Sequence, residues 1–584
     1  MKTNKIIIPF VALGLAFASC DDQMNYNEEP SKGKDYIESN FGRVGGFMTK
    51  LYKAVEYDFG QFNNGAMSAC ATDEAEYSQL GNTITDFYNG AWSPTNAHAG
   101  VWNNMYTAIQ DASHYIDFWQ GLEFKDYELD LNYNAQMHQY KNYYYEARFL
   151  RAYFYFTLNR YFGGVPIIKE GMTTAEINSL SRNTSDEVFK YIFDEIDAIT
   201  GEDGIISNYS DLGEFALGSA ETGRATRAAA LALKARAALY WASPLFNPTN
   251  DTERYKYAAK CYEDLFEECK ANKMKLAQKY SDLWGADNYS KPQTSREIIY
   301  GYRYGAISSP GDSYIESHSY PVGVQGGTGG NCPTQDLVDA YEMKNGKAIN
   351  EEGSGYDKND PYKNRDPRFA MTIAVNGDKW PTYSGTTPLE IFHGGLNGAP
   401  KTNATTTGYY LKKLCDGAIN FAANSTYKKS KHTYLNFRLG GAYLDFAEAM
   451  FKAYGDADAK PDGHTMSARE AVNEVRNRAG VKMPKITVSG DEFWAKLQNE
   501  RRVELAFEGH RFWDVRRWKE GPKWFSSITR CEIEKNVDPT DETKVTYTYK
   551  YTKANRQWDD KYYFFPIPQT ERMKNPNLEQ NPGW

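Results

Sequence analysis

The sequence lacks the short motifs that mark many enzymes and metal sites. Its 584 residues contain no HExxH, no GxSxG, no Walker loop and no EF-hand loop of correct spacing, and the eight histidines are scattered. The glycine-rich run 323–330 has no following GK[ST], which favours a surface loop over a phosphate cradle. We therefore expect no catalytic residues, no enzyme activity, no cofactor and no resident metal, although alternate acids at 456–463 leave calcium open.

Cysteine and clustered basic charge are also scarce. The six cysteines after Cys20 form no CxxC pair and are too sparse for a disulfide scaffold, so buried thiols and one or two bridges both stay open. The net charge is −9 at pH 7, and the densest basic run, 511–519, is interleaved with Asp514 and aromatic rings. This pattern indicates a packing segment, and we expect no nucleic-acid partner.

The sequence has only one long apolar run suited to membrane targeting, and it lies at the start. Lys2 and Lys5 precede an apolar stretch at 6–18 that is too short to span a bilayer, which predicts a signal peptide at 1–19. Ala-Ser-Cys20 resembles a bacterial lipobox, and the following Asp-Asp resembles the surface-export signal of Bacteroidetes lipoproteins. We expect a lipid anchor on Cys20, a polar tether at 20–40 and an exposed position on the outer membrane.

Aromatic residues and helical periodicity are abundant. The chain has 45 Tyr, 30 Phe and 12 Trp. Apolar residues recur at spacings of three and four in an N-terminal region, 41–272, and again within 433–584. The expected helices, two with capping boxes at Thr184 and Ser467, are 143–162, 184–199, 225–241, 253–271, 435–454, 467–479 and 491–507. Between 273 and 432 the composition predicts a loop-rich insert with short strands, and we expect a binding surface there.

Several blocks, in order along the chain, resemble the SusD/RagB family of outer-membrane nutrient-binding lipoproteins. They are EARFLRAY to NRYFGGVP (146–166), GRAT (223–226), RDPR (365–368), VNEVRNRAG (472–480), ERRVELAFEGHRFWDVRRW (500–518) and FPIP to NPG (565–583). The resemblance implies a mostly α fold, in which a tetratricopeptide-like scaffold of helix pairs carries a loop-rich insert. It assigns residues 273–584 to the SusD/RagB region. It also implies capture of a polysaccharide or oligosaccharide and its delivery to a SusC-type TonB-dependent transporter.

Candidate ligand-binding residues come from two places. Aromatic rings can cover the C–H face of a sugar, and amides and carboxylates can bind its hydroxyls. The loop before the first scaffold helices offers Asp73, Tyr88, Trp92 and Asn96, of which Trp92 and Asn96 resemble the sugar-binding pair of the starch-binding family member. The insert offers Tyr314, Tyr320 and Trp380, with Trp284, Tyr289, Tyr383 and Arg438 behind them.

Two alternatives stay beside glycan capture. RagB-like members imply a peptide-binding or purely adaptor subunit of the same kind of transporter. A helical glycoside hydrolase is the third hypothesis, with Asp73, Glu74 and Glu76 as the best carboxylate candidates. The charges of 500–504 have helix ion-pair spacing, and we interpret them as part of the scaffold.

Overall fold

The structure is a computed structural model that describes most of the chain. The described residues are 34–98, 100–169, 171–209, 223–285, 288, 296–303, 314–385, 387–421, 432–461 and 463–584. The predicted signal peptide, Cys20 and the first part of the predicted tether lie outside them. No helix among these residues is both long and apolar enough to cross a membrane.

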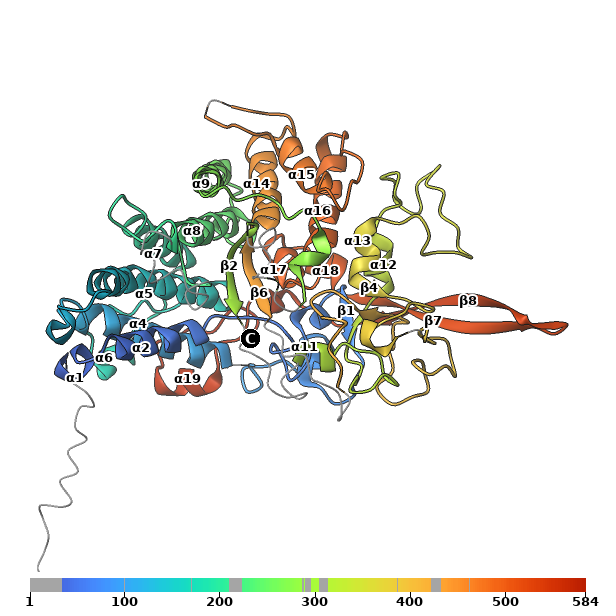
Figure 1. Cartoon of the computed structure of the whole chain (residues 1–584), viewed down its shortest axis with the longest axis horizontal. Helices are drawn as coiled ribbons and strands as arrows, with labels where there is room; N and C mark the ends of the chain where they lie inside the picture. The colour runs from blue at the N-terminus through green and yellow to red at the C-terminus, as the bar shows by residue number, and fades with distance from the viewer. Residues whose placement is uncertain are drawn as a thin grey trace, which may run out of the picture.

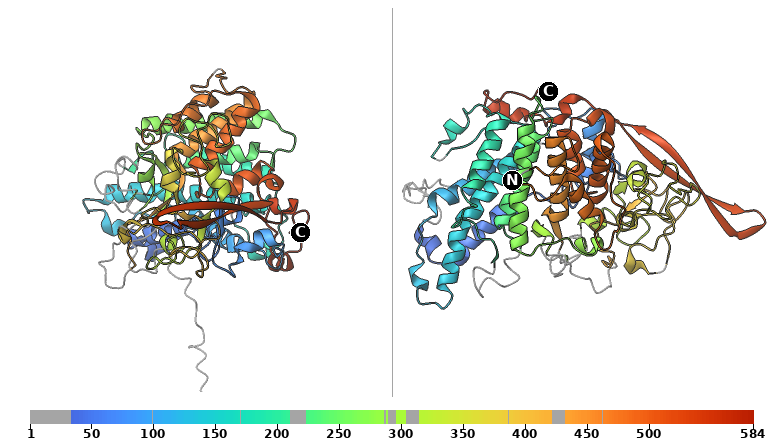
Figure 2. Two further views of the ribbon diagram at one scale, coloured as in Figure 1. Left: turned by 90° about the vertical axis from the view of Figure 1, so that its right-hand side faces the viewer. Right: turned by 90° about the horizontal axis from the view of Figure 1, so that it is seen from above.

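A curved row of paired helices forms the scaffold (Figure 1). Successive long helices contact one another along the row, from α4 and α5 through α7, α8 and α9 to α14 and α15, and Figure 2 shows them side by side from above. The long helices are α2 (Phe41–Lys53), α4 (Gly100–Phe118), α5 (Tyr133–Phe162), α7 (Ser185–Asp197), α8 (Arg227–Ala242), α9 (Thr252–Ala271), α14 (Leu439–Tyr454), α15 (Ala468–Arg476), α16 (Gly490–Glu504) and α17 (His510–Arg517). The predicted mostly α scaffold of helix pairs is confirmed.

Local sequence signals set the helix ends. In α7 the Thr184 hydroxyl accepts a hydrogen bond from the N–H of Glu187, and the Glu187 carboxylate accepts one from the N–H of Thr184. Ser467 and Glu470 form the same capping box at α15. Because Gly163 adopts a φ of 71°, it ends α5 where a side chain would be strained. The helix expected at 435–454 starts only at Leu439, since the preceding residues form a strand.

Shorter helices connect the scaffold and the insert. The short α-helices are α1 (Lys34–Glu38), α3 (Asp86–Asn89), α6 (Thr174–Ile177), α11 (Tyr314–Ser317), α12 (Gln335–Ala340), α13 (Pro367–Thr372), α18 (Gly521–Trp524) and α19 (Gln569–Lys574). The 3-10 helices are η2 (Ser68–Ala71), η3 (Thr83–Thr85), η4 (Lys125–Tyr127), η7 (Tyr280–Leu283), η10 (Thr382–Ser384) and η11 (Asp560–Tyr563).

Two small antiparallel sheets tie the insert to the scaffold, and a third lies within the insert. β1 (Ala75–Tyr77) pairs with β3 (Asn331–Pro333), and β4 (Ile373–Ala374) pairs with β5 (Tyr410–Leu411). β2 (Ile298–Arg303) pairs with β6 (Thr433–Arg438), which leads directly into α14. The predicted insert with short strands is therefore present.

A long hairpin projects from the body of the molecule (Figures 1 and 2). It pairs β7 (Ser527–Asp538) with β8 (Asp541–Asn555), and no strand at these positions was expected from the sequence. Alternate β8 tyrosines face the insert, where Tyr549 packs edge-on against Tyr362 and Tyr547 lies against Phe392. The middle of the hairpin is thus anchored by rings.

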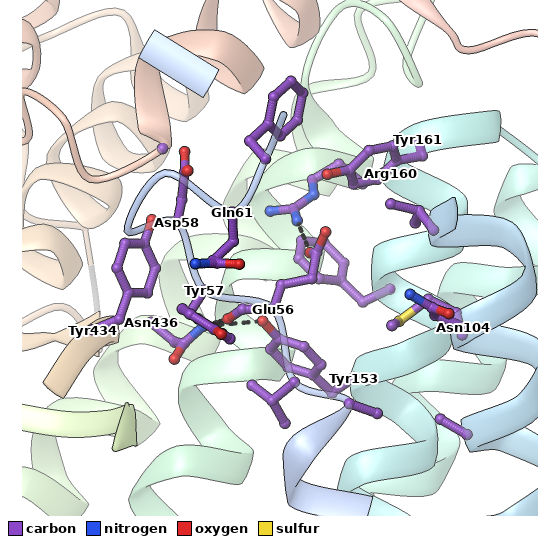
Figure 3. A pocket seen from close by; sticks show the side chains of 18 of the residues that line it. Glu56, Tyr57, Asp58, Gln61, Asn104, Tyr153, Arg160, Tyr161, Tyr434 and Asn436 are labelled. Carbon is purple, nitrogen blue, oxygen red and sulfur yellow. Dashed lines mark hydrogen bonds and ion pairs between the residues drawn. The ribbon is translucent and has the colours of Figure 1, made fainter. Parts of the chain in front are cut away.

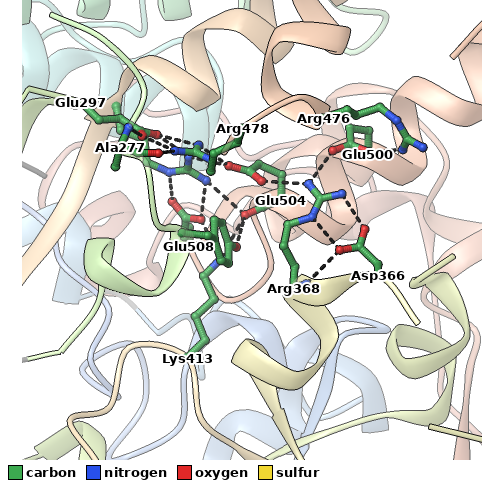
Figure 4. Close-up of polar contacts among 12 residues, drawn as sticks. Ala277, Glu297, Asp366, Arg368, Lys413, Arg476, Arg478, Glu500, Glu504 and Glu508 are labelled. Carbon is green, nitrogen blue, oxygen red and sulfur yellow. Dashed lines mark hydrogen bonds and ion pairs between the residues drawn. The ribbon is translucent and has the colours of Figure 1, made fainter. Parts of the chain in front are cut away.

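Buried charges hold the insert against α16 (Figure 4). Glu504 accepts hydrogen bonds from Arg368 at 2.8 Å, Arg438 at 2.9 Å and Arg478 at 2.9 Å. Each of these four side chains is at most 2% exposed. The predicted scaffold role of the 500–504 charges is confirmed, whereas Arg438, expected near the ligand, is buried in this network.

The carboxyl end crosses the scaffold as a strap. The side-chain amide of Asn581 donates to the carbonyls of Phe162 and Phe565, at 2.9 and 2.8 Å, and so fixes the strap to the end of α5. All six cysteines after Cys20 are buried free thiols, which answers the question that their spacing left open.

Candidate functional site

An open cleft of about 530 Å³ lies between the first scaffold helices and β6. It is bounded by the end of α2, the following segment 54–62, α4, α5, β6 and the segment 508–513 (Figure 3). Its volume falls in the range of small-molecule sites, roughly 300–1,000 Å³. We take this cleft as the candidate functional site.

Polar side chains from distant parts of the chain meet inside the cleft. Arg160 of α5 donates to the Glu56 carboxylate at 2.6 Å. The Asn436 amide of β6 donates to the Glu56 carbonyl at 2.9 Å and to the Tyr153 hydroxyl at 3.1 Å. These contacts fix the inner surface of the cleft, so its shape does not depend on a ligand.

Asp58 is the least satisfied carboxylate of the cleft. Its Oδ2 accepts hydrogen bonds from the Ser68 N–H and hydroxyl, at 2.8 and 2.7 Å, while its Oδ1 has no hydrogen-bond partner. Burial raises the pKa of Asp58 to about 6, against the lowering effect of the Ser68 hydrogen bonds. Ionisation of the Asp58 carboxyl group therefore lowers the free energy of unfolding.

Aromatic rings line the cleft beside these polar groups. Tyr57 stacks on Tyr302 with ring centroids 4.2 Å apart and an interplanar angle of 9°. The Arg160 guanidinium covers the Trp513 ring at 4.4 Å, and Tyr434 and Phe62 complete the aromatic wall. Rings and hydrogen-bonding groups in one cavity are the combination that binds a polyhydroxylated ring.

The cleft is balanced in charge. Its lining carries four basic side chains (Lys50, Lys53, Arg160 and Arg236) and four acidic ones (Glu56, Asp58, Asp111 and Glu508). The remaining titratable imidazole, His98, has a pKa lowered by burial and is neutral at pH 7. A cavity without excess charge suits a neutral ligand.

The residues expected from the first loop are placed differently. Trp92 is 1% exposed and packs against Phe565 at 4.6 Å, Phe87 at 4.7 Å and Trp584 at 5.1 Å. Its ring therefore belongs to the core and presents no face to a ligand, contrary to the expectation. Asp73 is buried between Arg502 and Arg511, at 2.7 and 2.8 Å, and is a structural ion-pair partner.

The two other carboxylates considered for hydrolysis also have structural surroundings. Glu76 pairs with Arg530 at 2.7 Å. Glu74 is 2% exposed, and burial together with Asp73 raises its pKa to about 8. Neither carboxylate lines the cleft.

Tyr88 and Asn96 stay near the surface but away from the cleft lining. Tyr88 is half-buried beneath the Arg556 guanidinium, 4.2 Å from the ring centroid. Asn96 is exposed, and its amide donates to Asp86 at 2.9 Å. Both side chains can still contact a ligand outside the cleft, and their role in binding stays a prediction.

The candidate binding residues of the insert also divide into buried and partly exposed side chains. Tyr320 is 0% exposed and donates its hydroxyl to the Asp416 carbonyl at 2.5 Å, so it is not a surface ring. Trp380 is half-buried, edge-on to Tyr320 at 6.0 Å, with Tyr383 beside the same ring. Trp284 is buried beneath Lys413. The Tyr314 side chain and Tyr289 lie outside the described residues.

Sequence reasoning missed the segment that contributes most to the cleft. Glu56, Tyr57, Asp58 and Gln61 lie in one loop between α2 and η2, turned at Gly60 with a φ of 82°. The signal was present as an acid, ring and amide cluster around a glycine, in a region read only as part of the helical scaffold. No group of His, Cys, Asp and Glu within the described ranges could hold a metal ion.

A scaffold of helix pairs that carries an irregular insert and an open polar cleft is the architecture of a helical ligand-binding protein. A model of the SusD family matches residues 270–584, and a model described as "Starch-binding associating with outer membrane" matches residues 43–239. The chain belongs to the SusD family. The family-level function is carbohydrate binding associated with the outer membrane.

Individual relatives agree with this assignment. The starch-binding protein SusD of Bacteroides thetaiotaomicron is 25% identical over 481 residues, 75% of this chain and 72% of that protein. SusD-like protein P2 of Formosa agariphila is 24% identical over 456 residues, 75% of this chain and 73% of that protein. The crystal structure of a SusD-like protein from Bacteroides fragilis has a TM-score of 0.73 and 24% identity, covering 94% of this chain and 98% of the other.

Proposed function

We propose that this protein is a lipid-anchored, surface-exposed glycan-binding protein of the outer membrane that captures a neutral oligosaccharide or polysaccharide segment in the cleft. The observation that carries the proposal is the cleft itself, where rings, amides and a balanced set of charges surround one cavity. Neutral sugars present C–H faces and hydroxyls, and the cleft offers partners for both. Binding alone requires no catalytic group.

Delivery to a SusC-type TonB-dependent transporter is the second part of the proposal. It is supported by family membership and by the lipoprotein signal that ends at Cys20. Tyr88, Asn96 and Trp380 stay candidates for contacts with a longer glycan outside the cleft, because each keeps some exposed surface.

The test blocks the cleft without disturbing the core. Asn104 is an exposed α4 residue that lines the cleft, and Asn103 is its exposed neighbour outside the lining. In affinity electrophoresis through a panel of plant, microbial and host polysaccharides, we expect one neutral polymer to retard the wild type. Asn104→Trp should weaken that retardation at least tenfold, whereas Asn103→Trp should not change it.

Two results would contradict the proposal. Equal retardation of wild type and Asn104→Trp would remove the cleft from the binding site. No retardation by any polysaccharide, together with co-purification of a barrel transporter, would favour the peptide-binding or adaptor alternative.

A further inference from the structure

A second cavity of about 550 Å³ lies on the helical scaffold and shares no lining residue with the cleft. It is enclosed by α4, α5, α7 and the segment after α5 that runs past Ile167. The lining residues are Ile116, Asp117, Tyr144, Arg148, Arg151, Ile167, Ile168, Lys169, Asn183 and Tyr191.

This cavity has an excess of positive charge, unlike the cleft. Arg148 and Arg151, one turn apart on α5, both pair with Glu195 of α7, at 2.9 and 3.0 Å. One carboxylate thus serves two guanidinium groups, and Arg151 also donates to the Ser113 hydroxyl at 3.2 Å. Lys169 adds a third cation at an exposed position, against Asp117 as the only acid in the described lining.

The guanidinium groups remain accessible to a ligand. Their side chains are 17% and 13% exposed for Arg148 and Arg151. Three of their N–H groups already donate to Glu195, so a ligand carboxylate would share these guanidinium groups with Glu195, with Lys169 as a further cation. The charge and geometry therefore indicate an anionic ligand group.

The remaining walls are apolar and aromatic. Tyr144 lies 5.7 Å from the Arg148 guanidinium, and Tyr191 lies 6.0 Å from that of Arg151. Ile116, Ile167 and Ile168 are each partly exposed on the same cavity. A carboxylate carried on a ring with C–H faces would contact both kinds of surface.

The backbone around the cavity is less suited to a peptide. The N–H of Ile167 already donates to the Asn183 side chain at 3.0 Å, and the N–H of Ile168 donates to the Tyr155 hydroxyl at 2.9 Å. The other walls are helices, whose interior backbone groups are bonded within the helix. An extended peptide would find no strand edge to pair with, whereas a sugar acid needs only side-chain partners.

We propose that this second cavity binds a hexuronate residue, with the carboxylate on Arg148 and Arg151 and the sugar ring between Tyr144 and Tyr191. The inference goes beyond the neutral-glycan cleft and does not depend on it. A glycan that contains acidic sugars would then contact the protein at two separate places, the cleft and the second cavity.

The test measures binding of trigalacturonate and of the neutral galactotriose to the purified full-length protein by isothermal titration calorimetry. We expect trigalacturonate to bind and galactotriose not to bind at this cavity. Arg151→Gln should weaken trigalacturonate at least tenfold, and Lys169→Gln should weaken it about threefold. Raising NaCl from 50 to 300 mM should weaken it further, because the contact is between charges.

Two controls separate this cavity from folding and from the cleft. Lys190→Gln removes an exposed α7 lysine outside the lining and should leave the affinity unchanged. Asn104→Trp blocks the cleft and should leave trigalacturonate binding unchanged as well. If Arg151→Gln does not fold, Lys169→Gln, at an exposed position, carries the test.

Four results would overturn the inference, of which the first three concern trigalacturonate. Those three are absence of trigalacturonate binding, equal affinity in wild type and Lys169→Gln, or loss of the binding in Asn104→Trp. Binding of a peptide carboxyl terminus at this cavity without any uronate binding would also overturn it. If no neutral glycan bound in the cleft, by contrast, the inference about hexuronate binding would be unaffected.

Discussion

Two charged regions of this molecule differ in how completely their carboxylates are paired. In the network around Glu504, each acid is surrounded by arginines that are themselves buried. In the cleft, Asp58 accepts two hydrogen bonds from Ser68 on one oxygen, and no basic side chain of the described residues forms an ion pair with it. Both regions were rich in acid and arginine in the sequence, yet only the cleft is open to a ligand.

The pKa values of the carboxylates in the network and in the cleft are shifted in opposite directions. Within the network, Arg478, Arg438 and Arg368 hold the pKa of Glu504 far below its usual range, against the effect of burial. In the cleft, burial prevails and the pKa of Asp58 rises. Opposite shifts therefore distinguish a buried carboxylate that arginines surround from one whose burial is not offset by basic partners.

Breaking the network should have the largest effect. Arg368→Met would leave the buried Asp366 without its ion-pair partner and would remove one arginine each from Glu500 and Glu504, a change that costs about 3–5 kcal/mol of unfolding free energy. Urea denaturation of the variant measures this loss. Lys190→Met, which breaks an ion pair with Asp194 between two largely exposed side chains, is the control and should lose under about 1 kcal/mol. Similar losses in both would mean that the network is not special.

Removing the Trp92 ring should come next. Since the ring is buried among Phe87, Phe565 and Trp584, Trp92→Ala should lower the unfolding free energy by about 3 kcal/mol. Glycan affinity per folded molecule should stay near that of the wild type, measured by calorimetry below the melting temperature. A stable variant that no longer binds glycan would restore Trp92 to the site.

The scaffold could be predicted from the sequence because its signals are local. The capping boxes at Thr184 and Ser467 and the apolar spacing of α5 and α7 are visible within one helix each. The long hairpin was missed although the tyrosines of β8 alternate with Thr and Lys, which is a strand pattern; what the sequence does not show is that these rings pack on Phe392, far along the chain.

The site could be predicted only in part. Rings in loops were expected to be exposed, but Trp92 and Tyr320 are covered by residues far along the chain, Phe565 and Phe421 among them. The cleft itself joins Asp58, Arg160 and Asn436, which are brought together only by the pairing of β2 with β6 and its packing on the scaffold. No spacing of residues in the sequence indicates that these three side chains lie close together.

Titrating the cleft should give a smaller effect that depends on pH. The pKa of Asp58 is about 6 in the folded protein against 3.8 for the free side chain, so the unfolded chain releases its proton first as pH rises. Stability from this group is therefore lost between about pH 4 and pH 6, by about 3 kcal/mol at most. Asp58→Asn should remove the loss, so its advantage over the wild type grows from pH 4 to pH 7 in urea denaturation. An advantage that is the same at both pH values would contradict the assignment.

The smallest effect is expected at the rim of the cleft. Lys50 pairs with Asp111 at 2.7 Å, but its side chain is 60% exposed, and such pairs contribute about 0–1 kcal/mol because water and salt screen them. Lys50→Gln should therefore change the unfolding free energy by less than about 0.5 kcal/mol and leave the affinity for a neutral glycan within twofold. Urea denaturation and calorimetry check both values. If Lys50→Gln instead destabilised the protein as much as Arg368→Met, exposure would not separate the two regions, and the rim would have to be counted as part of the buried framework.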